Sequence, residues 1–107
     1  MAVEIKVKGE VLTAYISGEI DHHTAASIRE SIDSAVELNM PSLLVLDFGS
    51  VSFMDSSGIG LVMGRYKIMA KRNGSVHISS TSPSLTKMFK LAGIERLASI
   101  DGETKRR

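Results

Sequence analysis

The stretch Leu43-Leu44-Val45-Leu46 decides the fold class of this chain. An uninterrupted aliphatic run is typical of a strand buried on both faces, and such strands lie mainly in the centre of parallel sheets. Pro41 precedes the run, and the polar segment 47–58 follows it. The sequence therefore predicts a central parallel strand with a loop at its carboxyl end, which leads into a helix.

The segments on either side of this strand alternate between strand and helix patterns. In chain order we expect strands over 3–8 and 11–17 joined by a hairpin turn at Gly9-Glu10, a helix capped by Asp21 or Thr24 and ending near Asn39, the central strand, a helix from Ser56 or Ser57 to about Arg72, a strand over 75–79, a helix over 83–91 and a weak strand over 97–100. This order predicts an α/β fold, with a mostly parallel mixed sheet that begins with an N-terminal hairpin and is covered by helices.

Composition limits the chemistry that the chain can perform. A length of 107 residues suits a single domain over 1–107. The absence of cysteine excludes a disulfide framework, a thiolate zinc site and a cysteine nucleophile. The net charge of +1 argues against direct nucleic-acid binding, and no apolar stretch approaches the roughly 18 residues of a membrane helix. We expect a cytoplasmic protein that does not enter the membrane and is a monomer when free.

The segment Asp55-Ser56-Ser57-Gly58 begins the second helix and is the most informative polar stretch. Asp and Ser are favoured helix caps, so capping alone explains these residues. It does not explain Gly58, Gly60 and Gly64, because glycine within a helix costs about 1 kcal/mol relative to alanine. Gly60 and Gly64 share one face and are expected to allow close packing on the sheet, while glycine beside the serines leaves the hydroxyls open to another protein.

A serine at a helix N-terminus is also a favourable place for a phosphate, because free backbone N–H groups and the helix dipole favour negative charge there. In parallel sheets, sites lie at the carboxyl ends of strands, which here means the loops after Ser17 and after Leu46. Catalytic motifs fit poorly: the segment lacks the glycine spacing of a nucleophile elbow or a dinucleotide fingerprint. We expect no catalytic residue and no cofactor.

The histidines and the Arg65-Tyr66 pair are further candidates for binding. The adjacent His22-His23 pair has no third histidine near it in sequence, so capping and surface roles are favoured and no metal is expected. His77 lies in an alternating strand and is expected to be structural. Arg65 and Tyr66 are candidate contact residues, although basic residues in this helix also suit the negative end of its dipole.

At these residues the chain resembles the anti-sigma factor antagonists of the STAS domain family. The segments that carry the resemblance are 18–25 (Gly-Glu-Ile-Asp-His-His-Thr-Ala), 52–60 (Ser-Phe-Met-Asp-Ser-Ser-Gly-Ile-Gly) and 64–67 (Gly-Arg-Tyr-Lys). The first and last are more similar to the sporulation branch, which antagonises the anti-sigma F factor, than to its general-stress counterparts. The resemblance spans almost the whole chain and implies a STAS-type fold.

The resemblance also implies a partner-switching mechanism. An anti-sigma factor that is also a serine kinase holds the sigma factor inactive, and the unphosphorylated antagonist binds the anti-sigma factor and frees sigma. The kinase then phosphorylates the antagonist, and a metal-dependent phosphatase reverses the modification. The acceptor of the family is the serine directly before the glycine, which is Ser57 here. The residues expected to meet the partner are Asp21, His22, Asp55, Ser56, Ser57, Gly58, Ile59 and Arg65.

Other functions remain open at this point. A STAS-type module of a stressosome or of a transporter-associated assembly uses the same fold, and a small nucleotide-binding enzyme is less favoured because no convergent acid/base set is visible. The chain also departs from the family at its end: members usually continue into a further C-terminal helix, whereas residues 103–107 (Glu-Thr-Lys-Arg-Arg) close this sequence.

Overall fold

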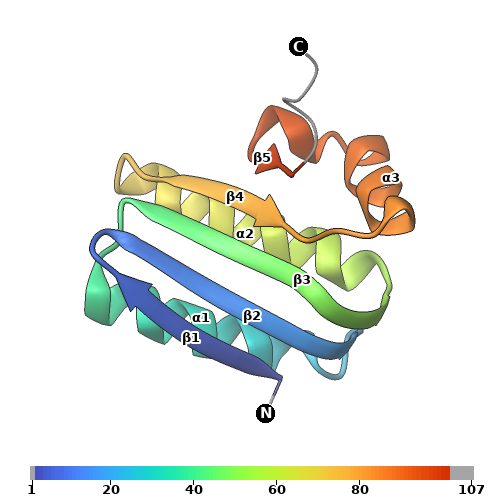
Figure 1. Ribbon diagram of the computed structural model, residues 1–107, viewed down its shortest axis with the longest axis horizontal. Coiled ribbons are helices and arrows are strands. Elements are labelled where there is room, and N and C mark those ends of the chain that lie inside the picture. Colours follow the sequence, from blue (N-terminus) through green and yellow to red (C-terminus); the bar gives the residue numbers. More distant parts are fainter. Residues whose placement is uncertain (1, 102–107) are drawn as a thin grey trace.

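The computed structural model describes residues 2–101, and the difference expected at the C-terminus lies outside these residues. Figure 1 shows the elements in chain order. They are β1 (Val3–Lys8), β2 (Val11–Ile20), α1 (Ala25–Asn39), β3 (Leu43–Met54), α2 (Ser56–Lys71), β4 (Ser75–Ser79), α3 (Pro83–Leu91), the 3-10 helix η1 (Ile94–Arg96) and β5 (Ser99–Ile100). None of the helices within the described range is long and apolar enough to cross a membrane.

The strands form one mixed sheet in the order β1-β2-β3-β4-β5. β1 and β2 are antiparallel, and the other neighbouring pairs are parallel. The hairpin turn has Gly9 at a φ of 60°, which a glycine adopts without steric cost. The predicted α/β fold, with an N-terminal hairpin followed by alternating helices and parallel strands, is confirmed.

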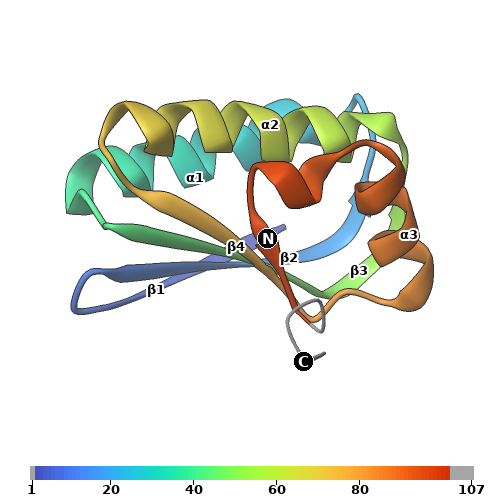
Figure 2. The same cartoon turned by 90° about the horizontal axis from the view of Figure 1, so that it is seen from above.

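The helices α1 and α2 lie together on one side of the sheet, as Figure 2 shows. Leu44 and Leu46 are fully buried beneath them, whereas Leu43 and Val45 point to the other face and are half-buried. The expectation that this strand is buried on both faces is therefore wrong. On this face, cross-strand neighbours flank the aliphatic side chains, since Val45 lies between Thr13 and His77.

The two central strands extend further than expected. β2 continues to Ile20 and β3 to Met54, and they stay paired over this extension through two irregularities in register. Irregularities of this kind interrupt the alternation of apolar and polar side chains, which is why residues 47–54 resemble a loop in sequence. The loops at the carboxyl ends of the strands therefore begin at Asp21 and Asp55, rather than after Ser17 and Leu46.

The helix boundaries agree with the local sequence signals. α1 ends at Asn39 before Met40, which adopts a left-handed φ of 49°, and α2 ends before Asn73 at a φ of 59°. In α3, the Ser82 hydroxyl caps the helix by accepting a hydrogen bond from the Leu85 N–H at 3.2 Å. The ring of Phe89 packs edge-to-face against Phe48 of β3, with centroids 5.2 Å apart, which fixes α3 at the end of the sheet.

The last strand, β5, is shorter than expected because the N–H groups of Leu97 and Ala98 both donate to the Ile94 carbonyl oxygen of η1. His77 helps to hold this short strand. Its Nδ1 lies 2.6 Å from Ser99 Oγ and its Nε2 lies 2.7 Å from Asp101 Oδ1. The imidazole of His77 thus joins β4 to residues in and beyond β5, which is the structural role that the sequence predicts for it.

Candidate functional site

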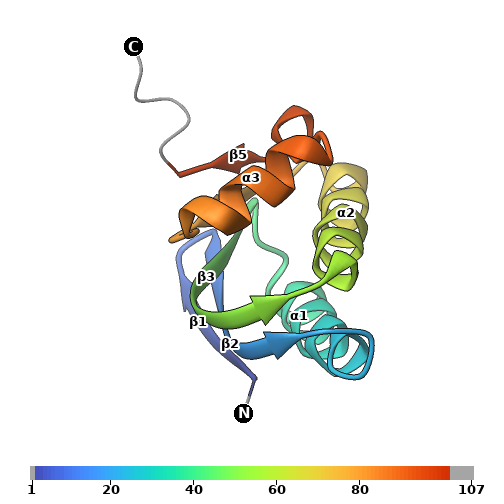
Figure 3. The same ribbon diagram turned by 90° about the vertical axis from the view of Figure 1, so that its right-hand side faces the viewer.

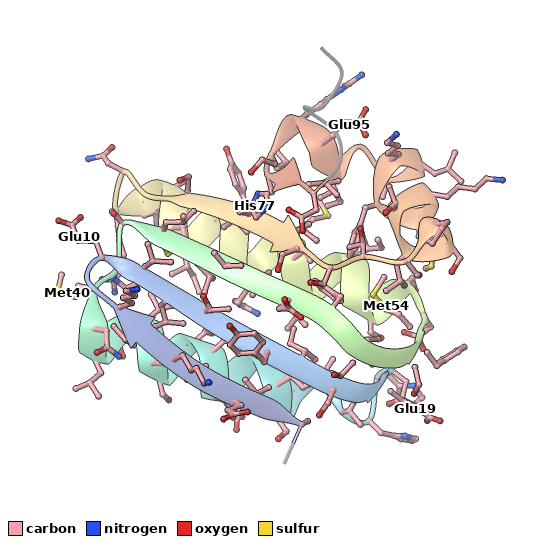
Figure 4. The ribbon with its side chains drawn as sticks, in the orientation of Figure 1. Glu10, Glu19, Met40, Met54, His77 and Glu95 are labelled. Carbon is pink, nitrogen blue, oxygen red and sulfur yellow. The ribbon has the colours of Figure 1, made fainter. Side chains whose placement is uncertain are left out.

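The candidate site lies where β2 and β3 end side by side. Figure 4 labels Glu19 near the end of β2 and Met54 at the end of β3, at the same end of the sheet. The Asp55 N–H donates a hydrogen bond to the Ile20 carbonyl oxygen at 3.0 Å, so the two following loops are tied together at their first residues. This places the 21–24 loop beside the start of α2.

Asp55 caps α2. Its backbone is extended, and its Oδ1 accepts a hydrogen bond from the Ser57 N–H at 2.8 Å. The predicted capping function is therefore confirmed for Asp55. The Ser57 hydroxyl itself forms no hydrogen bond within residues 2–101, and the Ser57 side chain is half-buried. The backbone of Ser57 is thus held in place while its hydroxyl is left without a partner.

Asp21 organises the neighbouring loop. Its Oδ1 accepts hydrogen bonds from the N–H groups of His23 at 2.9 Å and Thr24 at 3.0 Å. The bond from the Thr24 N–H is the main cause that lowers the pKa of the Asp21 carboxyl below 3.8. Thr24 occupies the N-cap position of α1, but its hydroxyl donates to Glu19 O at 2.9 Å instead of capping the helix. The loop therefore presents an ionised carboxylate beside the start of α2.

The two histidines of this loop are both exposed, and their rings lie in contact at a tilt of 38°, with centroids 4.0 Å apart. No group of three or more His, Cys, Asp or Glu side chains among residues 2–101 is placed to hold a metal ion. His22 contributes an exposed imidazole to the surface beside Asp21.

The glycines of α2 serve two different purposes. Gly58 is buried, and a Cβ at this position would collide with Sδ and Cγ of Met54. Gly60 and Gly64, in contrast, have no atom within 4 Å of the place where a Cβ would stand. The expectation that they permit close packing on the sheet is therefore wrong, because they border open space.

That open space is a surface hollow of about 370 Å³ between α1 and α2, which we call the Ser57 hollow. Figure 3 shows the two helices side by side. Besides Ser57, the residues that line it include Ala25, Arg29, Gly60, Gly64 and Arg65. Arg29 and the hollow were missed by the sequence analysis, although Ala25 and Arg29 lie four residues apart and so share a face of α1.

Arg65 does not lie where the sequence analysis expects it. Its side chain is only 5% exposed, and its Nε lies 2.9 Å from Oδ1 of Asp33 in α1. The N–H is poorly aligned for a hydrogen bond, so the pair interacts mainly through charge. Burial lowers the pKa of Arg65, and Asp33 opposes this effect. Because its guanidinium pairs with Asp33 in the interior, Arg65 is corrected from an exposed contact residue to an internal one.

The remaining predicted site residues lie at one end of the molecule. His22 and Ser56 are exposed, Asp21, Asp55, Ser57 and Ile59 are half-buried, and Gly58 is buried. Phe53 at the end of β3 is 52% exposed and adds an apolar side chain that the site prediction did not include. Together these residues form a surface that combines carboxylates, a free serine hydroxyl and apolar groups. We call it the helix-end surface.

Comparison with known proteins gives consistent results. The chain matches the STAS domain family over residues 2–105. It is 30% identical over 100 residues to an anti-sigma F factor antagonist of Paenibacillus polymyxa, covering 94% of this chain and 86% of that protein.

Two solved structures are similar in both sequence and shape. The unphosphorylated form of the anti-sigma factor antagonist SpoIIAA superimposes with a TM-score of 0.79 at 31% identity, covering 95% of this chain and 90% of the other. The phosphorylated form of the Bacillus cell fate determinant SpoIIAA gives a TM-score of 0.73 at 31% identity, covering 95% and 93%. From the family match over nearly all of its length and from these likenesses, we conclude that the chain belongs to the STAS domain family.

Proposed function

We propose that this protein is an anti-sigma factor antagonist whose binding is controlled by phosphorylation of Ser57. In its unphosphorylated form it binds a serine-kinase anti-sigma factor, which then releases its sigma factor. The observation that carries the proposal is the geometry of Ser57, whose backbone is held by the Asp55 cap while its hydroxyl is unpartnered. The solved relatives support it, since SpoIIAA at 31% identity is known in unphosphorylated and phosphorylated forms.

The helix-end surface explains how one phosphate could switch binding. Transfer from ATP forms a bond between Ser57 Oγ and the γ phosphorus, breaks the bond from that phosphorus to the bridging oxygen of ADP, and releases the hydroxyl proton. The product carries about −1.5 to −2 of charge at neutral pH. This charge lands beside the Asp55 carboxylate, on a surface that also contains the Asp21 carboxylate and apolar side chains. A partner surface that accepts the unmodified site through apolar contact or acidic groups is then repelled.

The switch requires no change of fold. The cap bond from Ser57 to Asp55 uses the backbone N–H, so modification of the hydroxyl leaves it in place. A negative group at the start of a helix is also compatible with the helix dipole. We infer a single-domain regulator over residues 1–107 that is not an enzyme, is a monomer when free, acts in the cytoplasm and is returned to its active form by a metal-dependent serine phosphatase.

Phosphorylation and binding can be tested in one set of measurements. The protein is incubated with a cognate kinase-type anti-sigma factor and ATP, and the phosphate is located by mass spectrometry. We expect it on Ser57, lost in Ser57→Ala and retained in Ser56→Ala. Binding to the anti-sigma factor is then measured by surface plasmon resonance, where Ser57→Asp is expected to weaken binding at least about 100-fold, which corresponds to about 2.7 kcal/mol.

The matched control is Ser34→Asp, which adds the same charge to an exposed position of α1. We expect it to bind as the unmodified protein does. Phosphate on another residue, or unchanged binding by a folded Ser57→Asp variant, would overturn the proposal. Circular dichroism establishes that both variants are folded, and an acidic residue in the first turn of α2 is favourable for the helix.

A further inference from the structure

We propose that the phosphate on Ser57 is held within the protein by two arginines, Arg29 and Arg65, which line the same hollow as the serine. The inference rests on the proposed phosphorylation of Ser57 and adds a receiving site for the phosphate. It implies that modification fills a basic hollow between α1 and α2, in addition to placing charge on the surface.

Helical spacing brings the relevant side chains together. Ala25, Arg29 and Asp33 lie four residues apart and form one stripe on α1. On α2, Ser57, Gly60 and Gly64 are spaced by three and four residues, so they also share one face of their helix. They line the Ser57 hollow opposite the stripe on α1. Arg65 enters the hollow from α2 and reaches Asp33 of α1 at 2.9 Å. Both arginines and Ser57 therefore line a single space between the helices.

The charges in this space do not balance. Asp33 is the only carboxylate within residues 2–101 that forms an ion pair with either arginine, and it pairs with Arg65. Arg29 lies near enough to contribute to the lowered pKa of Arg65, which means that the two positive charges repel each other. Asp55 caps α2 through its Oδ1 and forms no ion pair with either arginine within residues 2–101. An anion in the hollow would relieve the repulsion between the two guanidinium groups.

The hollow also has the room that a phosphate needs. Its volume is about 370 Å³, and the missing side chains of Gly60 and Gly64 keep it open. Guanidinium groups bind phosphate oxygens through paired, charge-assisted hydrogen bonds. The receiving site thus gives a reason for two helical glycines that packing does not explain.

The test measures the second pKa of the phosphate by ³¹P NMR. Phosphoserine is installed at position 57 during translation, so the measurement does not depend on any kinase. Free phosphoserine titrates at about 6, and opposite charges nearby favour the dianion. We expect the value in the folded protein to be at least about half a unit below that in the urea-unfolded protein. Arg29→Gln should remove most of this difference.

Lys71→Gln is the matched control, because it removes the same charge from an exposed residue at the far end of α2. We expect it to leave the ³¹P titration unchanged. Arg29 is exposed, so its replacement is not expected to unfold the domain. A phosphate pKa that is equal in folded and unfolded protein, or that responds equally to Arg29→Gln and Lys71→Gln, overturns the inference. Failure of a kinase to modify Ser57 would instead count against the proposed function, since the NMR result is obtained without it.

Discussion

Helix α2 has two sides that differ in nearly every respect. The side against the sheet buries Val62 and Met69, and there the backbone at Gly58 is pressed against Met54. The side toward α1 is left open at Gly60 and Gly64 and contains a buried arginine. Packing against the sheet on the first side stabilises the position of α2. The second side can therefore be loosely packed and form the hollow beside Ser57. Stability and function are thus separated on one helix.

The largest expected effect is on the packed side. Met69→Ala removes a fully buried side chain and leaves a cavity, so we expect a loss of about 3 kcal/mol in the free energy of unfolding. Met63→Ala makes the same change in the same helix at a residue that is 39% exposed, and should cost less than about 0.5 kcal/mol. Urea unfolding measures both. A similar loss of unfolding free energy in the two variants would contradict the difference between the packed side of α2 and the rest of the helix.

The ion pair between the helices is the next largest contribution. Asp33→Asn leaves the buried Arg65 guanidinium without its counter-charge, for which we expect a loss of about 2 kcal/mol. The value is below the roughly 3–5 kcal/mol of a fully buried pair because the Asp33 side chain is 35% exposed. Glu37→Gln, one turn further along α1 and exposed, should have little effect. Adding Arg65→Met to Asp33→Asn should recover part of the loss, and a further decrease would argue against an unpaired charge as its cause.

Replacing a glycine by alanine should have opposite effects on stability on the two sides of α2. Gly58→Ala places a Cβ against the Met54 side chain, and we expect it to destabilise the protein by about 1 kcal/mol. In Gly64→Ala the new Cβ points into open space, and alanine has a higher helix propensity than glycine. The substitution should therefore stabilise the unphosphorylated protein by up to about 1 kcal/mol. Thermal unfolding followed by circular dichroism distinguishes the two. A destabilised Gly64→Ala variant would show that this side of the helix is not open.

The smallest expected effect is the pH dependence at Asp21. Because its pKa in the folded protein lies below 3.8, the ionised carboxylate stabilises the fold above that pH, and the contribution is lost as the pH falls through the folded value. Asp21→Ala should therefore differ from the parent at neutral pH and approach it in acid. The main cause of the lowered pKa is the hydrogen bond from the Thr24 backbone N–H, which salt screens little. NMR of the Asp21 carboxyl should therefore give a pKa that stays low at high salt. An Asp21 pKa at or above 3.8 would contradict this.

Local sequence signals predict much of the fold. Gly9, Asn73 and the Ser82-Pro83 cap mark ends of elements correctly, and the alternation of strands and helices predicts the mixed parallel sheet. These signals depend on residues close together in the chain, so they can be interpreted without knowledge of the tertiary packing. The same holds for the Asp55 cap, because the carboxylate and the N–H that it binds are only two residues apart.

The extension of β2 and β3 could not be predicted in this way. Residues 47–54 carry the polar character of a loop, and they remain in the sheet because each strand supplies the other's hydrogen bonds. The burial of Arg65 has a similar cause, since Asp33 is distant in sequence and reaches it only when α1 and α2 pack together. In both cases the decisive partner belongs to another element.

By itself, the sequence determined the order of the elements, the caps and the position of Ser57 at the start of α2, because short-range hydrogen bonds and side-chain periodicity are sufficient for them. Only the tertiary structure decided that α1 and α2 lie on the same face of the sheet, that Gly60 and Gly64 border open space, and that Arg29 and Arg65 line one hollow with Ser57. These features depend on which surfaces of two helices face each other, and that is set by the packing of the whole domain on its sheet.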